Sequence, residues 1–285
     1  MPGWAGREKK EMENERQPPT PDAEHAQFRV GAFLILLALI AWLAKVPYLA
    51  EILGATGEVV SLWELAPAVV AEGLILSAIA IWIGLILGPK VGLGAPGVST
   101  WLSGGPGLGR RLRLLLVPSL IGGVAVGVAV AVVGTWLENA LIPKLPESTR
   151  RAQEVAEHMA AWKPLLASFS AGVTEELLFR LGLMTLFVWL GAKVSRRRPP
   201  GAQVFWTANF MAALLFGLAH LTNVVELDIP ITYGTVLDVL LVNGMGGMVF
   251  GWLYWRRGLE TAMLAHFVAD VVLKVAVPMI MIGPG

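Results

Sequence analysis

Three short stretches of the 285-residue chain place acids and histidines within long apolar runs. They read Glu-Glu-Leu-Leu-Phe-Arg at 175–180, Phe-Gly-Leu-Ala-His at 216–220 and His-Phe-Val-Ala-Asp at 266–270. A charge near the centre of a bilayer costs at least about 2.5–3.5 kcal/mol, so a charge kept there points to a functional site. Carboxylates and imidazoles together can activate water, which makes hydrolysis the first chemistry to consider.

In the first stretch, Glu176 and Arg180 have the i, i+4 spacing of an ion pair on one helical face. The acid stands on the N-terminal side, which is the favourable order. Glu175 lies about 100° around the helix from its neighbour and has no partner on its own helix. It is therefore the candidate general base. For Glu176 and Arg180 the alternative is a structural ion pair that joins helices.

The other two stretches each pair a histidine with a residue one helical turn away. Phe216 and His220 share a helix face, so the aromatic ring can pack beside the imidazole. His266 and Asp270 have the same spacing, and a carboxylate one turn from a histidine can fix its tautomer and orientation. Taken alone, each pair fits a buried structural contact equally well.

Counting residues from the basic loops gives the expected depth of each stretch in the membrane. Glu175 lies 18 residues before Lys193. His220 lies 20 residues after Pro200, so both groups are expected near one level. The third stretch follows Arg257 closely and is expected to be about 10–15 Å shallower. Helix tilt, or a turn that dips into the membrane before the last span, would remove this difference.

The composition is that of a membrane protein, because 55% of the residues are hydrophobic and 15% are charged. Seven apolar runs approach the roughly 20 residues that a helix needs to cross the hydrocarbon layer. They cover residues 28–44, 67–87, 114–137, 163–190, 203–222, 235–254 and 260–282. The predicted fold is therefore an all-α polytopic membrane bundle of seven transmembrane helices, or of eight if a broken segment hides another.

The chain divides into three parts. Residues 1–27 are charged and contain proline, and we expect a flexible cytoplasmic tail. Residues 28–162 supply the N-terminal spans, a Gly- and Pro-rich loop at 88–109 and an interfacial helix at 147–162. Residues 163–282 hold all three acid and histidine stretches and form the predicted catalytic core.

Basic residues gather in alternate loops. They are Lys90, Arg110, Arg111, Arg113, Lys193, Arg196, Arg197, Arg198, Arg256 and Arg257. The opposite loops are acidic or mixed, with Glu51, Glu58, Glu64, Glu226 and Asp228 against Lys45. By the positive-inside rule the N-terminus is cytoplasmic and the C-terminus of a seven-span chain faces outward. The chain has no cysteine, which excludes disulfides, thiolate nucleophiles and thiolate-bound metals.

The three stretches, in this order and on apolar runs, resemble the EExxxR, FxxxH and HxxxN/D motifs of the CAAX protease and bacteriocin-processing family, also called the Abi family. The resemblance covers about residues 163–282. It implies an intramembrane endopeptidase of the glutamic type that uses neither a cofactor nor a metal. It also implies roles in water activation for Glu175 and His220, in oxyanion stabilisation for His266 and Asp270, and in support for Glu176, Arg180 and Phe216.

One position departs from the eukaryotic branch of this family, which has Asn where this chain has Asp270. An ionised carboxylate would repel an oxyanion, so Asp270 must be protonated or must act by orienting His266. The change weakens the case for prenylated tails as substrates. The expected partner is a peptide or protein that is membrane-associated or lipidated, together with the lipid bilayer.

Two other functions fit parts of the same pattern. A metallopeptidase would use Glu175, His220 and His266 as zinc ligands, although the HExxH motif is absent. A transporter, receptor or immunity-type scaffold would use buried polar groups as a binding site or proton path. Its further candidates are Glu72, Asn209, Asp238, Asn243 and Lys274. For most of these we expect helix–helix hydrogen bonds, and for Lys274 an ammonium that reaches the headgroups. No nucleic-acid partner is predicted.

Overall fold

The computed structural model describes residues 21–55, 61–104, 108–141, 147–197 and 199–282. These residues form helices and no strand, which confirms the all-α prediction. Seven helices are long and apolar enough to cross a membrane, as predicted, and the described residues contain no eighth. Most of the expected N-terminal tail, residues 1–20, lies outside the described part of the chain. Helix α2 begins at Pro21, within the range expected to be a tail.

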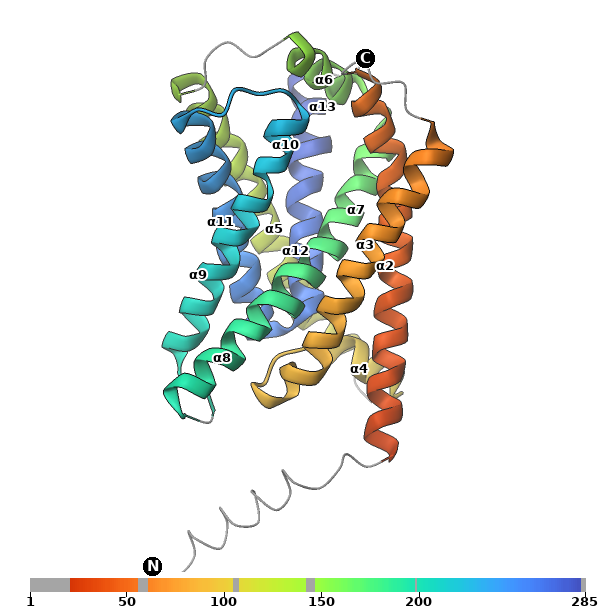
Figure 1. Ribbon diagram of the computed structural model, residues 1–285, viewed down its shortest axis with the longest axis vertical. Coiled ribbons are helices and arrows are strands. Elements are labelled where there is room, and N and C mark those ends of the chain that lie inside the picture. The colour runs from red at the N-terminus through yellow and green to blue at the C-terminus, as the bar shows by residue number, and fades with distance from the viewer. Residues whose placement is uncertain (1–20, 56–60, 105–107, 142–146, 198, 283–285) are drawn as a thin grey trace, which may run out of the picture.

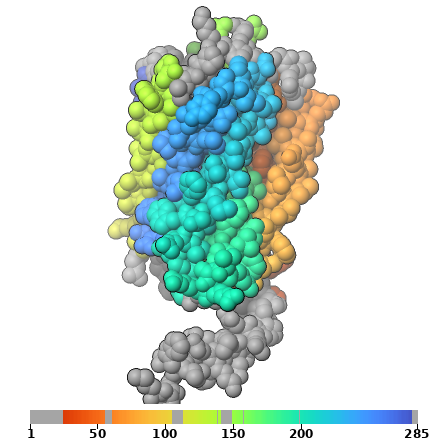
Figure 2. Space-filling model, turned by 60° about the vertical axis from the view of Figure 1, so that its left-hand side comes forward, coloured from red at the N-terminus to blue at the C-terminus, as the bar shows by residue number. Residues whose placement is uncertain are grey.

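The seven spans run side by side along the long axis of the molecule (Figures 1 and 2). The first three are α2 (Pro21–Ala55), α3 (Leu62–Leu87) and α5 (Leu108–Leu141). The others are α7 (Trp162–Glu176) with α8 (Thr185–Ser195), α9 (Ala202–Ala219), α11 (Tyr233–Arg257), and α12 (Leu259–Val271) with α13 (Val277–Ile282). Their outer faces carry large apolar side chains such as Ile79, Val132 and Phe210, which suits contact with lipid.

Two of these spans contain a π-helical segment that joins their two halves. Residues Leu177–Met184 connect α7 to α8, and Val272–Ala276 connect α12 to α13. π-helical turns widen the helix locally and are frequent at functional sites. In the first segment the hydroxyl of Thr185 donates to the carbonyl of Arg180 at 3.1 Å. Both segments lie directly after residues of the predicted site.

Glycines allow α12 to approach its neighbours closely at the centre of the bundle. A Cβ atom on Gly123 of α5 would lie 2.5 Å from the carbonyl oxygen of Ala265. A Cβ atom on Gly172 of α7 would lie 2.8 Å from the carbonyl oxygen of Met263 and 3.0 Å from the backbone nitrogen of Phe267. Because small residues let helix backbones touch, they set the positions of α5, α7 and α12.

The segment predicted as a loop at 88–109 contains helical structure, so that part of the prediction is wrong. A 3₁₀ turn covers Gly88–Lys90 and the seven-residue helix α4 covers Pro96–Leu102. Proline suits the first turn of a helix, where its missing N–H is not needed. The carboxylate of Glu260 also accepts a hydrogen bond from the backbone N–H of Val98 at 2.7 Å, which stabilises the start of α4.

This segment lies beneath the turn between α11 and α12 and explains the depth of the last span. Gly258 makes the turn with a φ of 100°, a conformation that favours glycine. The backbone N–H of Leu259 then donates to the carbonyl of Gly94 at 3.0 Å. Figure 1 shows the α11–α12 turn well inside the level reached by the α8–α9 connection. The stretch at 266–270 is therefore not shallower than the other two, because this turn dips into the bundle. Such a dip was one of the two arrangements expected to remove the difference in depth.

The predicted interfacial helix at 147–162 is present as α6 (Glu147–His158). It lies across one end of the bundle, at the end where α10 (Leu221–Glu226) is found (Figure 1). The hydroxyl of Thr149 donates to the carbonyl of Leu227 at 2.7 Å and ties α6 to the residue after α10.

Replacing Gly172 with alanine is expected to lower the thermal stability of the protein in detergent. The new methyl group would press on the backbone of α12, and overpacking of this kind costs about 1–3 kcal/mol. Gly244→Ala on α11 is the matched control, because a Cβ atom there would have nothing within 4 Å. An equal effect of the two substitutions on the melting temperature would contradict the close α7–α12 contact.

Candidate active site

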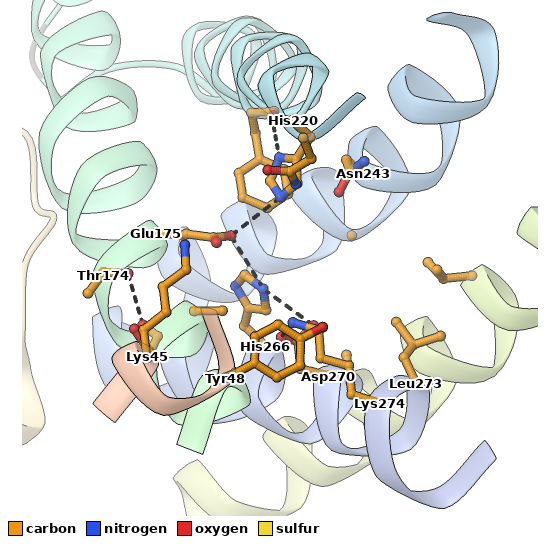
Figure 3. Close-up of a pocket in the computed structure, with 18 of the residues that line it drawn as sticks. Lys45, Tyr48, Thr174, Glu175, His220, Asn243, His266, Asp270, Leu273 and Lys274 are labelled. Carbon is orange, nitrogen blue, oxygen red and sulfur yellow. Dashed lines mark hydrogen bonds and ion pairs between the residues drawn. The ribbon is translucent and has the colours of Figure 1, made fainter. Parts of the chain in front are cut away.

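Three helices bring Glu175, His220 and His266 to one point within the bundle (Figure 3). The carboxylate oxygen Oε2 of Glu175 lies 3.8 Å from Nε2 of His220 and 3.7 Å from Nε2 of His266. This oxygen is buried and has no hydrogen-bond partner among the described residues. Glu175 and His220 lie side by side, as their expected common level allows, and His266, which was expected to be shallower, is beside them.

Glu176 is a buried carboxylate that joins two other site residues. Its Oε2 atom accepts a hydrogen bond from Nε of Arg180 at 3.1 Å, and both side chains are fully buried. This confirms the predicted i, i+4 ion pair. Its Oε1 atom accepts a hydrogen bond from the Nδ1–H group of His266 at 2.9 Å. The second contact was not predicted, because the two residues are 90 positions apart in the sequence.

The orientation of His266 therefore comes from a different carboxylate than the one predicted. Asp270 lies one turn along the same helix, but its Oδ1 atom is 4.0 Å from Nε2 of His266, beyond hydrogen-bond distance. Glu176 holds the opposite edge of the ring. The ring of Phe250 stacks on the imidazole, with a centroid distance of 4.7 Å and an interplanar angle of 15°. The His266 side chain is thus fixed by one hydrogen bond and one flat aromatic contact.

The imidazole of His220 is held by its own helix. Its Nδ1 atom lies 2.8 Å from the backbone carbonyl oxygen of Phe216. A carbonyl oxygen can only accept, so Nδ1 carries the hydrogen and Nε2 of the neutral ring is an acceptor. This acceptor atom faces Glu175.

The ring of Phe216 packs against both imidazoles, with centroids 4.6 Å from His220 and 5.9 Å from His266. The shared helix face predicted for Phe216 and His220 is confirmed. The same ring covers the guanidinium of Arg180, whose carbon Cζ lies 5.3 Å from the ring centroid. Phe216 thus packs against the guanidinium of Arg180 and against both imidazoles.

Asp270 forms an ion pair that the sequence analysis missed. Its Oδ2 atom accepts a hydrogen bond from Nζ of Lys274, one turn further along the span, at 2.5 Å. The expectation that Lys274 reaches the headgroups is therefore wrong. A carboxylate within reach inside the protein is a stronger partner for a buried ammonium than a distant interface. The i, i+4 spacing of the two residues was the signal that could have revealed this pair.

Helix–helix hydrogen bonds were predicted for most other polar residues of the spans, and the structure shows one for Asn209 but not for Asn243. The side-chain amide of Asn209 donates to the carbonyl of Met248 on α11 at 2.9 Å, which is the expected helix–helix hydrogen bond. The amide of Asn243 instead donates to Val239 of its own helix at 2.8 Å. Glu72 is exposed on the outer side of α3.

A cavity of about 370 Å³ connects these residues to the surface. Its lining includes the side chains of Glu175, His220, His266, Asp270 and Lys274. Two residues of α2, Lys45 and Tyr48, also line it and point toward the site in Figure 3. Lys45 was predicted to lie in a loop after a first span ending at residue 44, but α2 continues to Ala55.

The carboxylate of Glu175 lies between the imidazoles of His220 and His266. Two ion pairs, Glu176–Arg180 and Asp270–Lys274, lie next to these three side chains. Such a set can take a proton from water and can stabilise negative charge that develops opposite it. Among the described residues, no group of three or more His, Asp or Glu side chains is spaced to hold a metal ion. The three residues considered as zinc ligands accordingly do not form such a group.

Residues 157–272 match the family model described as type II CAAX prenyl endopeptidase Rce1-like. The matched range contains Glu175, His220, His266 and Asp270 and ends just before Lys274. Neither a curated protein nor a solved structure matches the chain.

Removing one partner of the Asp270–Lys274 pair is expected to destabilise the protein more than removing both. Lys274→Met leaves a carboxylate without its cation, and a lost hydrogen bond between charged groups costs about 1–3 kcal/mol. Asp270→Asn combined with Lys274→Met removes both charges and is expected to recover part of the melting temperature. The two single substitutions and the double substitution, measured in one detergent, give the coupling energy. Strictly additive effects would contradict the ion pair.

Proposed function

We propose that this chain, whose residues 157–272 match the Rce1-like type II CAAX prenyl endopeptidase model, hydrolyses peptide bonds with water activated by Glu175. The match and the seven spans support a multi-pass membrane protease of the CAAX type. The glutamic mechanism, the residue roles and the substrate are our proposals. The observation that carries them is the position of one carboxylate oxygen less than 4 Å from two imidazole nitrogens.

A water molecule between Glu175 and His220 accounts for their geometry. Nε2 of neutral His220 and ionised Oε2 of Glu175 are both acceptors, 3.8 Å apart, and would repel one another without a donor between them. Water has two O–H groups and can donate one to each. In this position its oxygen is oriented for attack and Glu175 is ready to take its proton.

The proposed reaction proceeds by direct attack of water on the substrate carbonyl. The water oxygen bonds to the carbonyl carbon while one water proton moves to Glu175. The tetrahedral intermediate then collapses, the C–N bond breaks, and the proton on Glu175 passes to the leaving nitrogen. The products are a new carboxyl terminus and a new amino terminus, so atoms and charges balance without a cofactor.

Protonated His266 is the proposed donor to the oxyanion. Its Nδ1–H is engaged by Glu176, so Nε2 can donate only when the ring is the imidazolium. Three carboxylates, those of Glu175, Glu176 and Asp270, lie within 4.0 Å of this ring and would stabilise an imidazolium. Among the described residues His220 has one carboxylate within that distance, so the charge is assigned to His266.

Lys274 resolves the objection that the sequence raised against Asp270. A free carboxylate would repel the developing oxyanion, whereas a carboxylate paired with an ammonium adds little net charge. In this proposal Asp270 stabilises the imidazolium of His266, and Lys274 acts through Asp270 as a positioning residue. The pair thereby takes the place of the neutral Asn found in the eukaryotic branch.

Glu175→Gln is expected to abolish peptide cleavage without unfolding the protein. Glutamine keeps the shape of the side chain but cannot accept the proton, and loss of a general base reduces rates by about 10²–10⁴-fold. The measurement compares peptides that accumulate in cells expressing the wild type or the variant, followed by the purified enzymes on the peptide identified. Glu72→Gln, at an exposed acid on the outer side of α3, is the matched control. Cleavage by purified Glu175→Gln at the control's rate would remove the proposal.

Lys274→Met is expected to lower kcat by about 10²-fold, the effect of losing one oxyanion-stabilising group, with little change in KM. Adding Asp270→Asn should restore activity to within about tenfold of wild type, because the amide is neutral and can donate to the oxyanion. A purely structural pair would recover stability in the double variant but would not separate kcat from KM in this way. A double variant no more active than Lys274→Met would contradict the assigned role.

A further inference from the structure

We infer that the substrate reaches this site from the non-cytoplasmic side of the membrane, as an extended segment of an exported or membrane-anchored protein or peptide. The inference rests on the proposed function for the cleavage step, but the side of access follows from the cavity and the charges. Three observations carry it: where the cavity is lined, where the bundle is closed, and how basic residues are distributed between its two ends.

The cavity extends from the site toward one end of the bundle. Beyond the catalytic residues it is lined by Leu49, Ile52 and Leu53, near the C-terminal end of α2. On the opposite wall it is lined by Asn223 and Glu226 of α10, both exposed. Figure 1 places α10 and α6 at the same end of the molecule as the last helix, α13. The mouth of the cavity therefore lies at this end.

Helix lengths agree with this position. Glu175 is 13 residues after Trp162, where α7 begins, and 20 residues before Ser195, where α8 ends. At about 1.5 Å per residue, the site lies roughly 20 Å from the first end and roughly 30 Å from the second. The carboxylate is thus in the half of the bundle that faces the mouth.

The opposite end is closed by packed side chains. Leu181, Met184, Leu253 and Tyr254 are almost completely buried between the site and that end. The hydroxyl groups of Tyr254 and Thr185 are hydrogen-bonded at 2.7 Å within this layer. The segment that includes α4 then covers the α11–α12 turn from below, as described above. A peptide has no route to Glu175 through these described residues without moving them.

The closed end is the basic end. The α8–α9 connection carries exposed Lys193, Arg196 and Arg197, and the α11–α12 turn carries exposed Arg256 and Arg257. At the mouth, α6 carries the exposed Arg150 and Arg151 together with Glu154, and Lys163 is paired with Glu51. Glu226 and Asp228 add negative charge, so basic residues do not predominate at this end. Loops rich in Lys and Arg remain in the cytoplasm. The closed end, where α2 begins at Pro21, is therefore assigned to the cytoplasm, and the mouth to the other side.

The mouth also limits the shape and character of the substrate. One wall is apolar and comes from α2, whereas the other presents the amide of Asn223 and the carboxylate of Glu226. A segment next to a membrane anchor meets both requirements, because one part is apolar and the next is solvated. It must be extended, since a cavity of about 370 Å³ holds only a few residues and cannot admit a folded domain.

The natural absence of cysteine makes the side of access directly measurable. Single cysteines are introduced by Asn223→Cys at the mouth and by Val194→Cys, an exposed residue at the basic end. Intact spheroplasts are treated with a membrane-impermeant maleimide, and permeabilised cells serve as the reference. We expect modification of Asn223→Cys in intact spheroplasts, and of Val194→Cys only after permeabilisation. The reverse pattern would overturn the inference whatever the activity of the enzyme.

A second variant tests whether water reaches the site through this mouth. Asn243→Cys lies deeper in the cavity, and we expect its modification by the same reagent from outside, more slowly than at position 223. Modification from the cytoplasmic side alone would contradict the inference. Peptides present with the wild type but absent with Glu175→Gln are expected in the medium rather than in the cytosol. If no such peptide exists anywhere, the proposed function fails, while the labelling still decides the side of access.

Discussion

The structure depends on one fully buried carboxylate, that of Glu176. One of its oxygens accepts a hydrogen bond from the guanidinium of Arg180, and the other accepts one from Nδ1–H of His266. Burying this charge without partners would be strongly unfavourable, so the three side chains must be brought together when the helices pack. The same contacts join α12 to α7 and to the π-helical segment Leu177–Met184 that follows α7. They also turn Nε2 of His266 toward Glu175.

The geometry of the candidate site therefore follows from the requirement to satisfy buried charges. Glycine contacts set the spacing of α5, α7 and α12, and Phe216 fills the space between Arg180 and the imidazoles. Within this frame Glu175 is the carboxylate whose Oε2 is left without a hydrogen-bond partner among the described residues. A buried carboxylate oxygen that has no hydrogen-bond partner and is held in a rigid surround suits a general base, because water and substrate can complete its contacts.

The sequence was sufficient to predict whatever depends on local spacing. Apolar runs predicted the seven spans, and the i, i+4 rule predicted the Glu176–Arg180 pair. It was insufficient where the partner comes from another helix, as in the bond from His266 to Glu176. The dip of the α11–α12 turn likewise depends on a contact with Gly94, far away in the sequence. The i, i+4 spacing of Asp270 and Lys274 also indicated their pair, but it was overlooked because a lysine near the end of a span can equally reach the headgroups.

The central claim is that Glu175 and His220 share one water molecule as its two acceptors. A high-resolution structure of the wild-type protein in lipid nanodiscs tests this most directly. The account predicts an ordered water within about 3.2 Å of both Oε2 of Glu175 and Nε2 of His220. A direct hydrogen bond between the two side chains, or a separation that no single water can bridge, would contradict it.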